Sequence, residues 1–222
     1  MMALADFLAV HGSPVRIEKK FVLKKAQSLL AVRCLSRMNA AVVFQPRQVN
    51  SIYFDDFELS ALRDNIDGNP YRDKLRVRWY GEDRKRATIE IKHKRNILGA
   101  KSSFALNGAL SEEHLLYDVK RWMTLNVRQS LFPVSKVTYT RQYFMLGEIR
   151  VTADSQIHSH RLVGNQIVKS LNHDYEVIEL KYEPSLDEVA RSLIAEMERF
   201  SLRPGKCSKY ANSLMDFNIT VY

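Results

Sequence analysis

The chain has 222 residues, 45% of them hydrophobic, and 34 Lys and Arg against 25 Asp and Glu give it a formal net charge of +9. This length and apolar content support one well-buried domain, and the positive charge favours an acidic partner: nucleic acid, anionic lipid or a phosphate compound. The only two cysteines, Cys34 and Cys207, lie far apart, which argues against a zinc site or a disulfide framework and fits a reducing compartment.

The N-terminal residues are mildly apolar but lack a basic leader and a cleavage site, and no run of 18 apolar residues occurs anywhere. We therefore expect a cytoplasmic protein without a membrane segment of its own. Residues 1–13 are expected to form an N-terminal extension with a short helix at 3–9, and residues 14–222 a single domain.

Hydrophobic periodicity predicts an α+β domain dominated by antiparallel strands. The expected strands, in chain order, are 14–20, 48–55, 71–80, 86–94, 134–145, 148–157 and 175–183. The expected helices are 23–37, 57–65, 111–127 and a last one that begins at a capping box of Ser185 and Glu188 and ends near Phe200. A glycine-bearing loop is expected after residue 94.

The strand at 71–80 carries the most informative pattern. Successive side chains of a strand point to opposite faces, so Arg76 and Arg78 share one face while Leu75, Val77 and Trp79 share the other. Similar alternation of charged and apolar residues occurs at 16–20, 89–92, 150–154 and 177–181. For one strand a solvated outer face is an equal alternative, but the repetition favours a sheet curled around a polyanion.

Other constellations give little support to other chemistries. His158 and His160 share a strand face but have no third metal ligand at a set spacing. The sequence has no phosphate-binding glycine loop, no nucleophile elbow and no helix-turn-helix or zinc-finger spacing, so specific nucleic-acid binding is not expected. If ATP binds, side chains must hold its phosphates.

Several short motifs, in this order, resemble the VTC domain, the polyphosphate polymerase domain of the vacuolar transporter chaperone family within the triphosphate tunnel, or CYTH-like, metalloenzymes. The resemblance covers about residues 14–216. Its landmarks are Arg16-Ile-Glu-Lys-Lys20, Ser51-Ile-Tyr-Phe-Asp55, Arg76-Val-Arg-Trp-Tyr-Gly81, Ile89-Glu-Ile-Lys92, Tyr139-Thr-Arg-Gln-Tyr143, Arg150-Val-Thr-Ala-Asp154, Glu179-Leu-Lys181 and Lys206-Cys-Ser-Lys-Tyr210. It implies an eight-stranded antiparallel β-tunnel with flanking helices, in which the γ-phosphate of ATP is transferred to a polyphosphate chain.

The resemblance also implies roles for individual residues. Arg76, Arg78, Lys92, Arg141 and Arg150 would be catalytic and would bind phosphate. Further phosphate ligands would be Arg16, Lys20, Lys101, Lys181, Lys206, Ser208 and Lys209. Mn²⁺ or Mg²⁺ would be held by Glu179 first, with Glu90 and Glu18 as the other candidates, because carboxylates and phosphate oxygens are the usual ligands of these ions.

One departure bears on the reaction. The CYTH branch opens with Glu-x-Glu-x-Lys, whereas this chain has Arg16 in place of the first carboxylate, which favours the polymerase branch. The alternatives are a metal-dependent hydrolase of inorganic or nucleoside triphosphate and a non-catalytic polyphosphate-binding module. The expected partners are therefore ATP, inorganic triphosphate or polyphosphate, and any coupling to transport would need a membrane-protein partner that the sequence does not identify.

Overall fold

The computed structural model describes residues 15–218. Its strands are β1 (Arg16–Lys24), β2 (Ala41–Asp55), β3 (Tyr71–Tyr80), β4 (Asp83–Arg95), β5 (Leu98–Asn107), β6 (Phe132–Leu146), β7 (Ile149–Val163), β8 (Gln166–Asn172) and β9 (Tyr175–Tyr182). Its α-helices are α2 (Ser28–Arg37), α3 (Ser60–Ile66), α4 (Glu112–Asn126), α5 (Asp187–Arg199) and α6 (Lys209–Met215). Two short 3₁₀ turns, Lys25–Gln27 and Pro184–Leu186, precede α2 and α5.

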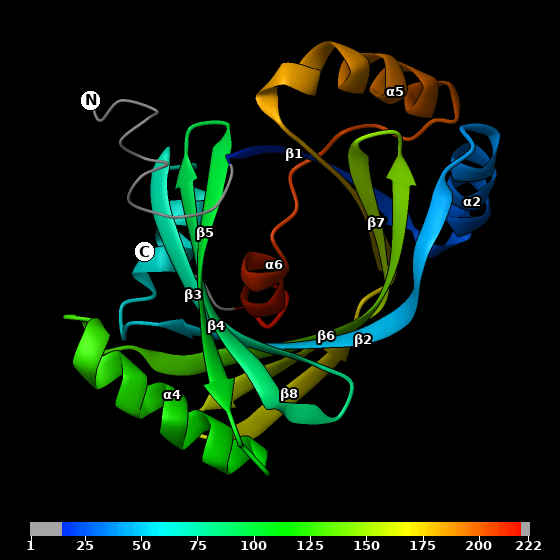
Figure 1. Cartoon of the computed structure of the whole chain (residues 1–222). Coiled ribbons are helices and arrows are strands. Elements are labelled where there is room, and N and C mark those ends of the chain that lie inside the picture. The colour runs from blue at the N-terminus through cyan, green and yellow to red at the C-terminus, as the bar shows by residue number, and fades with distance from the viewer. Residues whose placement is uncertain (1–14, 219–222) are drawn as a thin grey trace.

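Eight of the strands close into a ring. The order is β6-β2-β3-β4-β5-β1-β9-β7, and a further pairing between β6 and β7 joins the two ends (Figure 1). Every pairing is antiparallel, and β8 is a ninth strand that pairs only with β7. The predicted α+β fold with an eight-stranded antiparallel ring is confirmed, and we call this element the strand ring.

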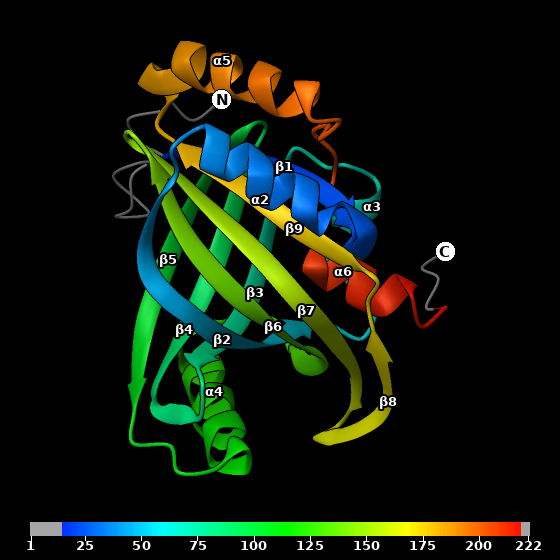
Figure 2. The ribbon, with the colours of Figure 1, turned by 90° about the vertical axis from the view of Figure 1, so that its right-hand side faces the viewer.

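Helices cover parts of the outside of the strand ring (Figures 1 and 2). The outward residues Leu75, Val77 and Trp79 of β3 are buried in one cluster with Leu115 and Val119 of α4. A second cluster joins outward residues of β1, β7 and β9 to α2 and α5. Because the apolar faces are buried on the outside, the charged faces of the same strands must point inward.

The short helix α6 lies within the outline of the strand ring in the end-on view (Figure 1) and at one end of it in the side view (Figure 2). Its residues Tyr210, Ala211 and Leu214 are buried in a third cluster with inward residues of several strands, Tyr53 and Tyr139 among them. The Tyr210 hydroxyl donates to the Asp55 carboxylate, which also accepts from the backbone N–H groups of Ala61 and Leu62 in α3. This carboxylate therefore links α6 to the wall of the strand ring.

Three sequence predictions need correction, and two elements were not predicted. The helix expected from residue 23 begins at Ser28, because β1 continues to Lys24 and buries Leu23. The expected loop after residue 94 is largely strand β5, which pairs with β4 over its full length. The last helix has no side-chain cap and begins at Asp187 after a 3₁₀ turn. Strand β8 and helix α6 were not predicted, and the expected helix at 3–9 lies outside the described residues.

We predict that Asp55→Ala lowers the free energy of unfolding by about 3 kcal/mol, because it leaves the buried Tyr210 hydroxyl and the N–H groups of Ala61 and Leu62 without their acceptor. Tyr210→Phe, the control, removes only one of these contacts and should cost about 1 kcal/mol. Urea unfolding followed by circular dichroism measures both. Equal stability of Asp55→Ala and wild type would mean that this carboxylate does not hold α6 and α3 in place.

Candidate functional site

The interior of the strand ring is lined by charged residues that face one another in register. Arg76 of β3 lies opposite Glu90 of β4, Lys20 of β1 opposite Glu179 of β9, and Arg141 of β6 opposite Asp154 of β7. Residues directly opposite each other in an antiparallel pair share one face of the sheet. The strand ring therefore gathers inward charges from β1, β3, β4, β5, β6, β7 and β9.

Glu90 is saturated by cations. Its Oε2 atom lies 2.6 Å from an Nη atom of Arg76 and 3.7 Å from Arg78, and its Oε1 atom accepts from Lys101 at 2.6 Å. Burial opposes ionisation of this carboxyl, but the charges of Arg76, Arg78 and Lys101 outweigh burial and hold its pKa well below the ordinary value. Glu90 thus orients three cations and has its oxygens occupied.

Two further carboxylates, Glu18 and Glu179, lie close together on neighbouring strands. Glu179 is held loosely: its Oε1 atom lies 3.8 Å from Lys20, and its Oε2 atom lies 3.1 Å from Lys181 and 4.0 Å from Arg141. Burial disfavours its charge, but Lys181, Lys20 and further cations keep its pKa well below the ordinary value. Glu179 is therefore a buried anion whose contacts leave room for another ligand.

Glu18 accepts from Lys92 and faces the Glu179 charge. Burial and the nearby Glu179 raise its pKa, whereas Lys92, Lys181 and Lys20 lower it, and the net shift is downward. Both carboxylates are therefore ionised at neutral pH in spite of their mutual repulsion.

Asp154 ties α6 to the charged interior. It accepts two hydrogen bonds from Arg141, at 2.6 and 2.7 Å, and one from Lys209 at the start of α6. Burial opposes its charge, but Lys209 and Arg141 hold its pKa well below the ordinary value. Asp154 belongs to the Arg150–Asp154 motif but was not predicted to have a role, although its shared strand face with Arg150 was a usable signal.

Lys74 was also missed, although it lies two residues before Arg76 on the same strand face. Its ammonium nitrogen bonds to Asn65 and lies 3.0 Å from the Ser208 hydroxyl. Burial, together with the charges of Lys20, Lys92, Arg72 and Arg76, lowers its pKa to about 6. Burial and the crowding of positive charge together favour a neutral lysine at pH 7.

Two of the remaining predicted residues, Arg150 and Arg16, lie near each other. Burial and the charges of Arg16 and Arg141 lower the pKa of Arg150. The Nε atom of Arg150 is buried and has no hydrogen-bond partner among residues 15–218. An anion in the interior would supply the missing acceptor and offset the repulsion.

The structure brings most of the predicted site residues into this network. Those joined by the contacts above are Glu18, Lys20, Arg76, Arg78, Glu90, Lys92, Lys101, Arg141, Glu179, Lys181, Ser208 and Lys209. Lys206 is exposed, and it is not among the residues that these contacts join.

A divalent cation fits best beside Glu179 and Glu18. No group of three or more His, Cys, Asp or Glu able to hold a metal occurs in the described part of the chain, so most ligands would come from water and phosphate oxygens, as is usual for Mg²⁺. Thr152 lies opposite Glu179, and its buried hydroxyl has no partner within the described residues. This unsatisfied hydroxyl and the loose contacts of Glu179 suit a hydrated ion, whereas the saturated oxygens of Glu90 do not.

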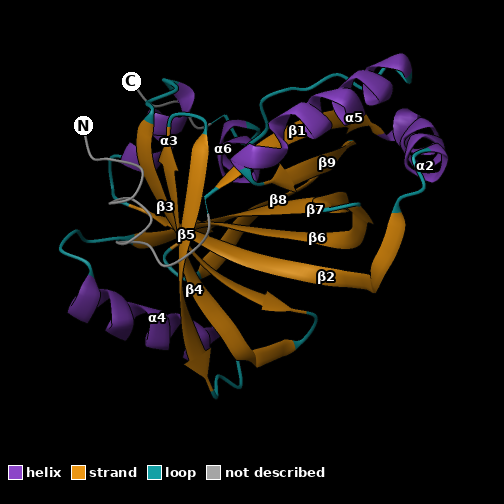
Figure 3. Cartoon of the chain, turned by 45° about the horizontal axis from the view of Figure 1, so that its top comes forward, coloured by secondary structure: helices purple, strands orange, loops and turns teal. Residues whose placement is uncertain are grey.

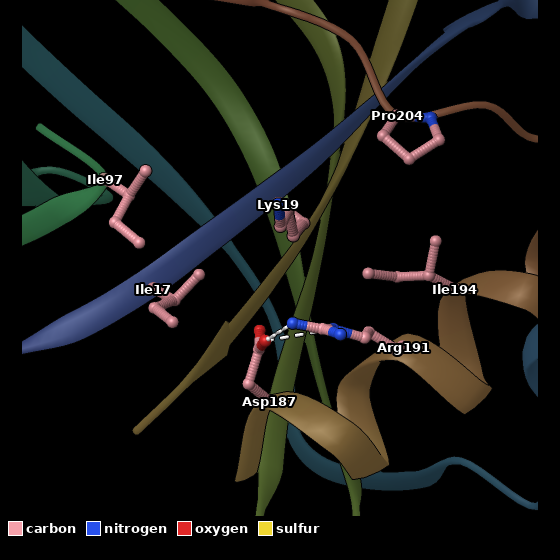
Figure 4. Close-up of a pocket in the computed structure, with 7 residues that line it drawn as sticks. All are labelled: Ile17, Lys19, Ile97, Asp187, Arg191, Ile194 and Pro204. Carbon is pink, nitrogen blue, oxygen red and sulfur yellow. Dashed lines mark hydrogen bonds and ion pairs between the residues drawn. The ribbon is translucent and has the colours of Figure 1, made fainter. Parts of the chain in front are cut away.

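Two pockets lie on the outer side of the strand ring, and of the charged residues described above only Asp154 lines either of them. One, of about 370 Å³, lies between β1, α5 and the turn after β4, and outward residues such as Ile17 and Lys19 line it together with the Asp187–Arg191 ion pair (Figure 4). The other, of about 530 Å³, lies mainly against apolar residues beside α2. Neither pocket has the row of cations that a polyphosphate needs.

The family of the chain is given by a match to a known family model. The model of the VTC domain matches residues 15–218, which is nearly the whole chain. The chain belongs to the VTC domain family. No curated protein matches it.

Several solved structures share the fold of this VTC domain, whose strands run around a common interior (Figure 3). They include the PH1012 protein of Pyrococcus horikoshii, with a TM-score of 0.55 and 14% identity over 88% of this chain and 98% of that one. A proposed adenylate cyclase of Vibrio parahaemolyticus has a TM-score of 0.55 and 13% identity, covering 90% of this chain and 98% of its own.

A proposed adenylyl cyclase of Hippeastrum, described as having a dominant triphosphatase activity, gives a TM-score of 0.55 at 10% identity, covering 91% and 95% of the two chains. At such identities these similarities establish the fold alone. Within residues 15–218, no helix has the length and apolar character needed to cross a bilayer.

Because the pKa of Lys74 is lowered in the folded protein, the free energy of unfolding should depend on pH. Unfolding returns Lys74 to its ordinary pKa of 10.5 from about 6, so the unfolded chain binds one more proton between these values. The wild-type free energy of unfolding should therefore gain a component that rises with pH from 6 to 10. We predict that Lys74→Met removes this component and is more stable than wild type at pH 7. Denaturant unfolding of both proteins at several pH values measures it; parallel pH profiles would show that Lys74 is charged in the folded protein.

Proposed function

We propose that this VTC domain is a metal-dependent phosphotransferase that moves the γ-phosphate of ATP onto a polyphosphate chain inside the strand ring. The observation that carries the proposal is the enclosed network in which Lys and Arg outnumber the carboxylates Glu18, Glu90, Asp154 and Glu179. Enclosed like charges are costly unless an anion compensates them, and a triphosphate is an anion of suitable charge.

The residues of the chain can supply most of what phosphoryl transfer needs. This reaction depends on positioning and on stabilising charge, and it needs no protein nucleophile. A terminal oxygen of the polyphosphate attacks the γ-phosphorus, the bond from phosphorus to the bridging β,γ-oxygen breaks, and ADP leaves. Arg78 and Arg141 are buried, permanently charged donors, and Arg offers a planar pair of N–H groups to each phosphate.

Glu179, with Glu18 beside it, would hold Mg²⁺ or Mn²⁺. When bound, the ion would contribute charge stabilisation to the transferring phosphate group. The cations Lys20, Lys92 and Lys181 around these two carboxylates would hold the phosphate oxygens in place and keep both carboxylates ionised.

A triphosphatase is the second candidate, and one specific observation favours it: the Hippeastrum protein with the same fold is described as having a dominant triphosphatase activity. In that reaction water takes the place of the polyphosphate as acceptor in the same site. Arg16, which stands where the CYTH branch has a glutamate, instead supports the polymerase.

The deciding experiment incubates the purified chain with ATP and either Mn²⁺ or Mg²⁺ and follows long-chain polyphosphate, free phosphate and ADP. Polyphosphate together with ADP is the expected result. Free phosphate without polymer would replace the proposal by the triphosphatase. Binding of ATP without turnover would leave only a polyphosphate-binding module.

We predict that Glu179→Gln separates binding from chemistry. The variant keeps the shape of the side chain but loses the charge that would hold the ion, so turnover should fall by about 100-fold or more. Triphosphate binding measured without metal should remain or tighten, because the surrounding cations are freed.

Glu90→Gln is the matched control, since the same change falls on a carboxylate with occupied oxygens. It should lower the melting temperature but leave the metal concentration for half-maximal activity unchanged. An unchanged metal requirement in Glu179→Gln would remove Glu179 from the ion site.

A further inference from the structure

An aromatic cluster lies on the inner face of the strand ring, beyond the charged network. It consists of Phe44 and Arg47 of β2, Tyr80 of β3 and Tyr143 of β6. The Arg47 guanidinium lies 4.8 Å from the ring centroid of Phe44, 5.3 Å from that of Tyr143 and 5.7 Å from that of Tyr80. Phe44 and Tyr143 meet edge to face with centroids 5.7 Å apart. None of these four residues was predicted to have a functional role.

Strand register places the cluster next to the candidate phosphate ligands. Tyr80 lies two residues after Arg78, and Tyr143 two residues after Arg141, so each shares the inward face of its arginine and lies about 7 Å further along its strand. Arg47 lies directly opposite Arg141. The cluster therefore continues the row of phosphate ligands instead of forming a separate surface.

The cluster lies toward the end of β2 that is remote from α6. Tyr53 of β2 contacts Tyr210 of α6, with ring centroids 5.2 Å apart, whereas Arg47 precedes Tyr53 on the same strand by roughly 20 Å. Phe44 is 51% exposed and Tyr80 is 40% exposed, whereas Arg78 and Arg141 are buried. Aromatic faces are thus accessible on the side of the phosphate ligands that α6 does not occupy.

The chemistry of the cluster differs from that of the rest of the interior. Phosphate oxygens need cations and hydrogen-bond donors, and the exposed faces of Phe44 and Tyr80 supply neither. Aromatic faces next to an arginine are a stacking platform for a nucleobase, which tolerates any base because every base has a π-face. Burial and then the neighbouring Tyr80 hydroxyl raise the pKa of Tyr143, so this phenol stays neutral at pH 7 and adds no negative charge near the phosphates.

We propose that Phe44, Arg47, Tyr80 and Tyr143 form the subsite for the base of a nucleoside triphosphate whose phosphates lie among Arg78 and Arg141. This rests on the proposed function, in which the strand ring binds triphosphate. The subsite gives the protein a means to distinguish a nucleotide donor from inorganic triphosphate or polyphosphate, which have no base. Because stacking carries the recognition, ATP and GTP bind with similar affinity.

The test compares ATP with inorganic tripolyphosphate by isothermal titration calorimetry in wild type, Phe44→Leu and Tyr80→Leu. Loss of one stacking face should weaken ATP binding about tenfold and leave tripolyphosphate binding near that of wild type. Tyr80→Phe keeps the aromatic face and should retain ATP affinity. Tyr117→Leu removes an exposed tyrosine from α4 on the outside of the strand ring and is the matched control.

Saturation-transfer NMR on the wild-type protein gives a second readout that does not depend on a variant folding. The base protons of ATP should receive more saturation than its ribose protons. Three results would each overturn the subsite. They are an equal loss of affinity for ATP and tripolyphosphate in the leucine variants, an unchanged ATP affinity in both of them, and a base that receives no saturation. If wild type binds no tripolyphosphate at all, the proposed function fails first, and that outcome is distinct from the failure of the subsite alone.

Discussion

The enclosure of like charges is the constraint on which the rest of this structure depends. A closed strand ring that points its charged face inward must balance cations that bulk water screens only in part. Glu90, Asp154 and Glu179 do so in part, each with two or three cations around it. Burial and then the surrounding cations lower the pKa of Lys74 to about 6, in line with an excess of positive charge in the interior. A bound polyanion completes it, which links the fold directly to the proposed substrate.

Burial of the apolar outer faces stabilises this inward arrangement of charges. Trp79 and its neighbours on β3 are buried under α4, and the outward residues of β1 and β9 are buried under α2 and α5. Two of the hydrophobic clusters therefore lie on the outside of the strand ring, and a third packs inward residues of the strands against α6. One end of the interior holds α6, whose Lys209 and Ser208 join the charged network, so the helix also takes part in the site.

The features that could be predicted from the sequence are those set by the alternation of side chains along a strand. Alternation on β3, β4 and β9 placed Arg76, Arg78, Glu90, Glu179 and Lys181 on inward faces, and the ordered motifs predicted the VTC family and the closed sheet. This alternation could not show how α6 enters the strand ring, because the seven residues of that helix carry no periodic signal long enough to reveal their neighbours. It also missed β5, whose Gly99 and paired serines are typical of a loop, and the contact of Asp154 with Lys209, which lies 55 residues away. Such contacts depend on the tertiary fold.

The central claim is that the interior of the strand ring is an anion site that exists before any metal binds. Isothermal titration calorimetry of the metal-free protein with inorganic tripolyphosphate at several salt concentrations tests it most directly. The account predicts one binding event whose affinity falls as the salt concentration rises, as expected for ion pairs, and whose affinity is reduced in Arg78→Ala. Absence of binding at low salt, or binding that Arg78→Ala leaves unchanged, would contradict it.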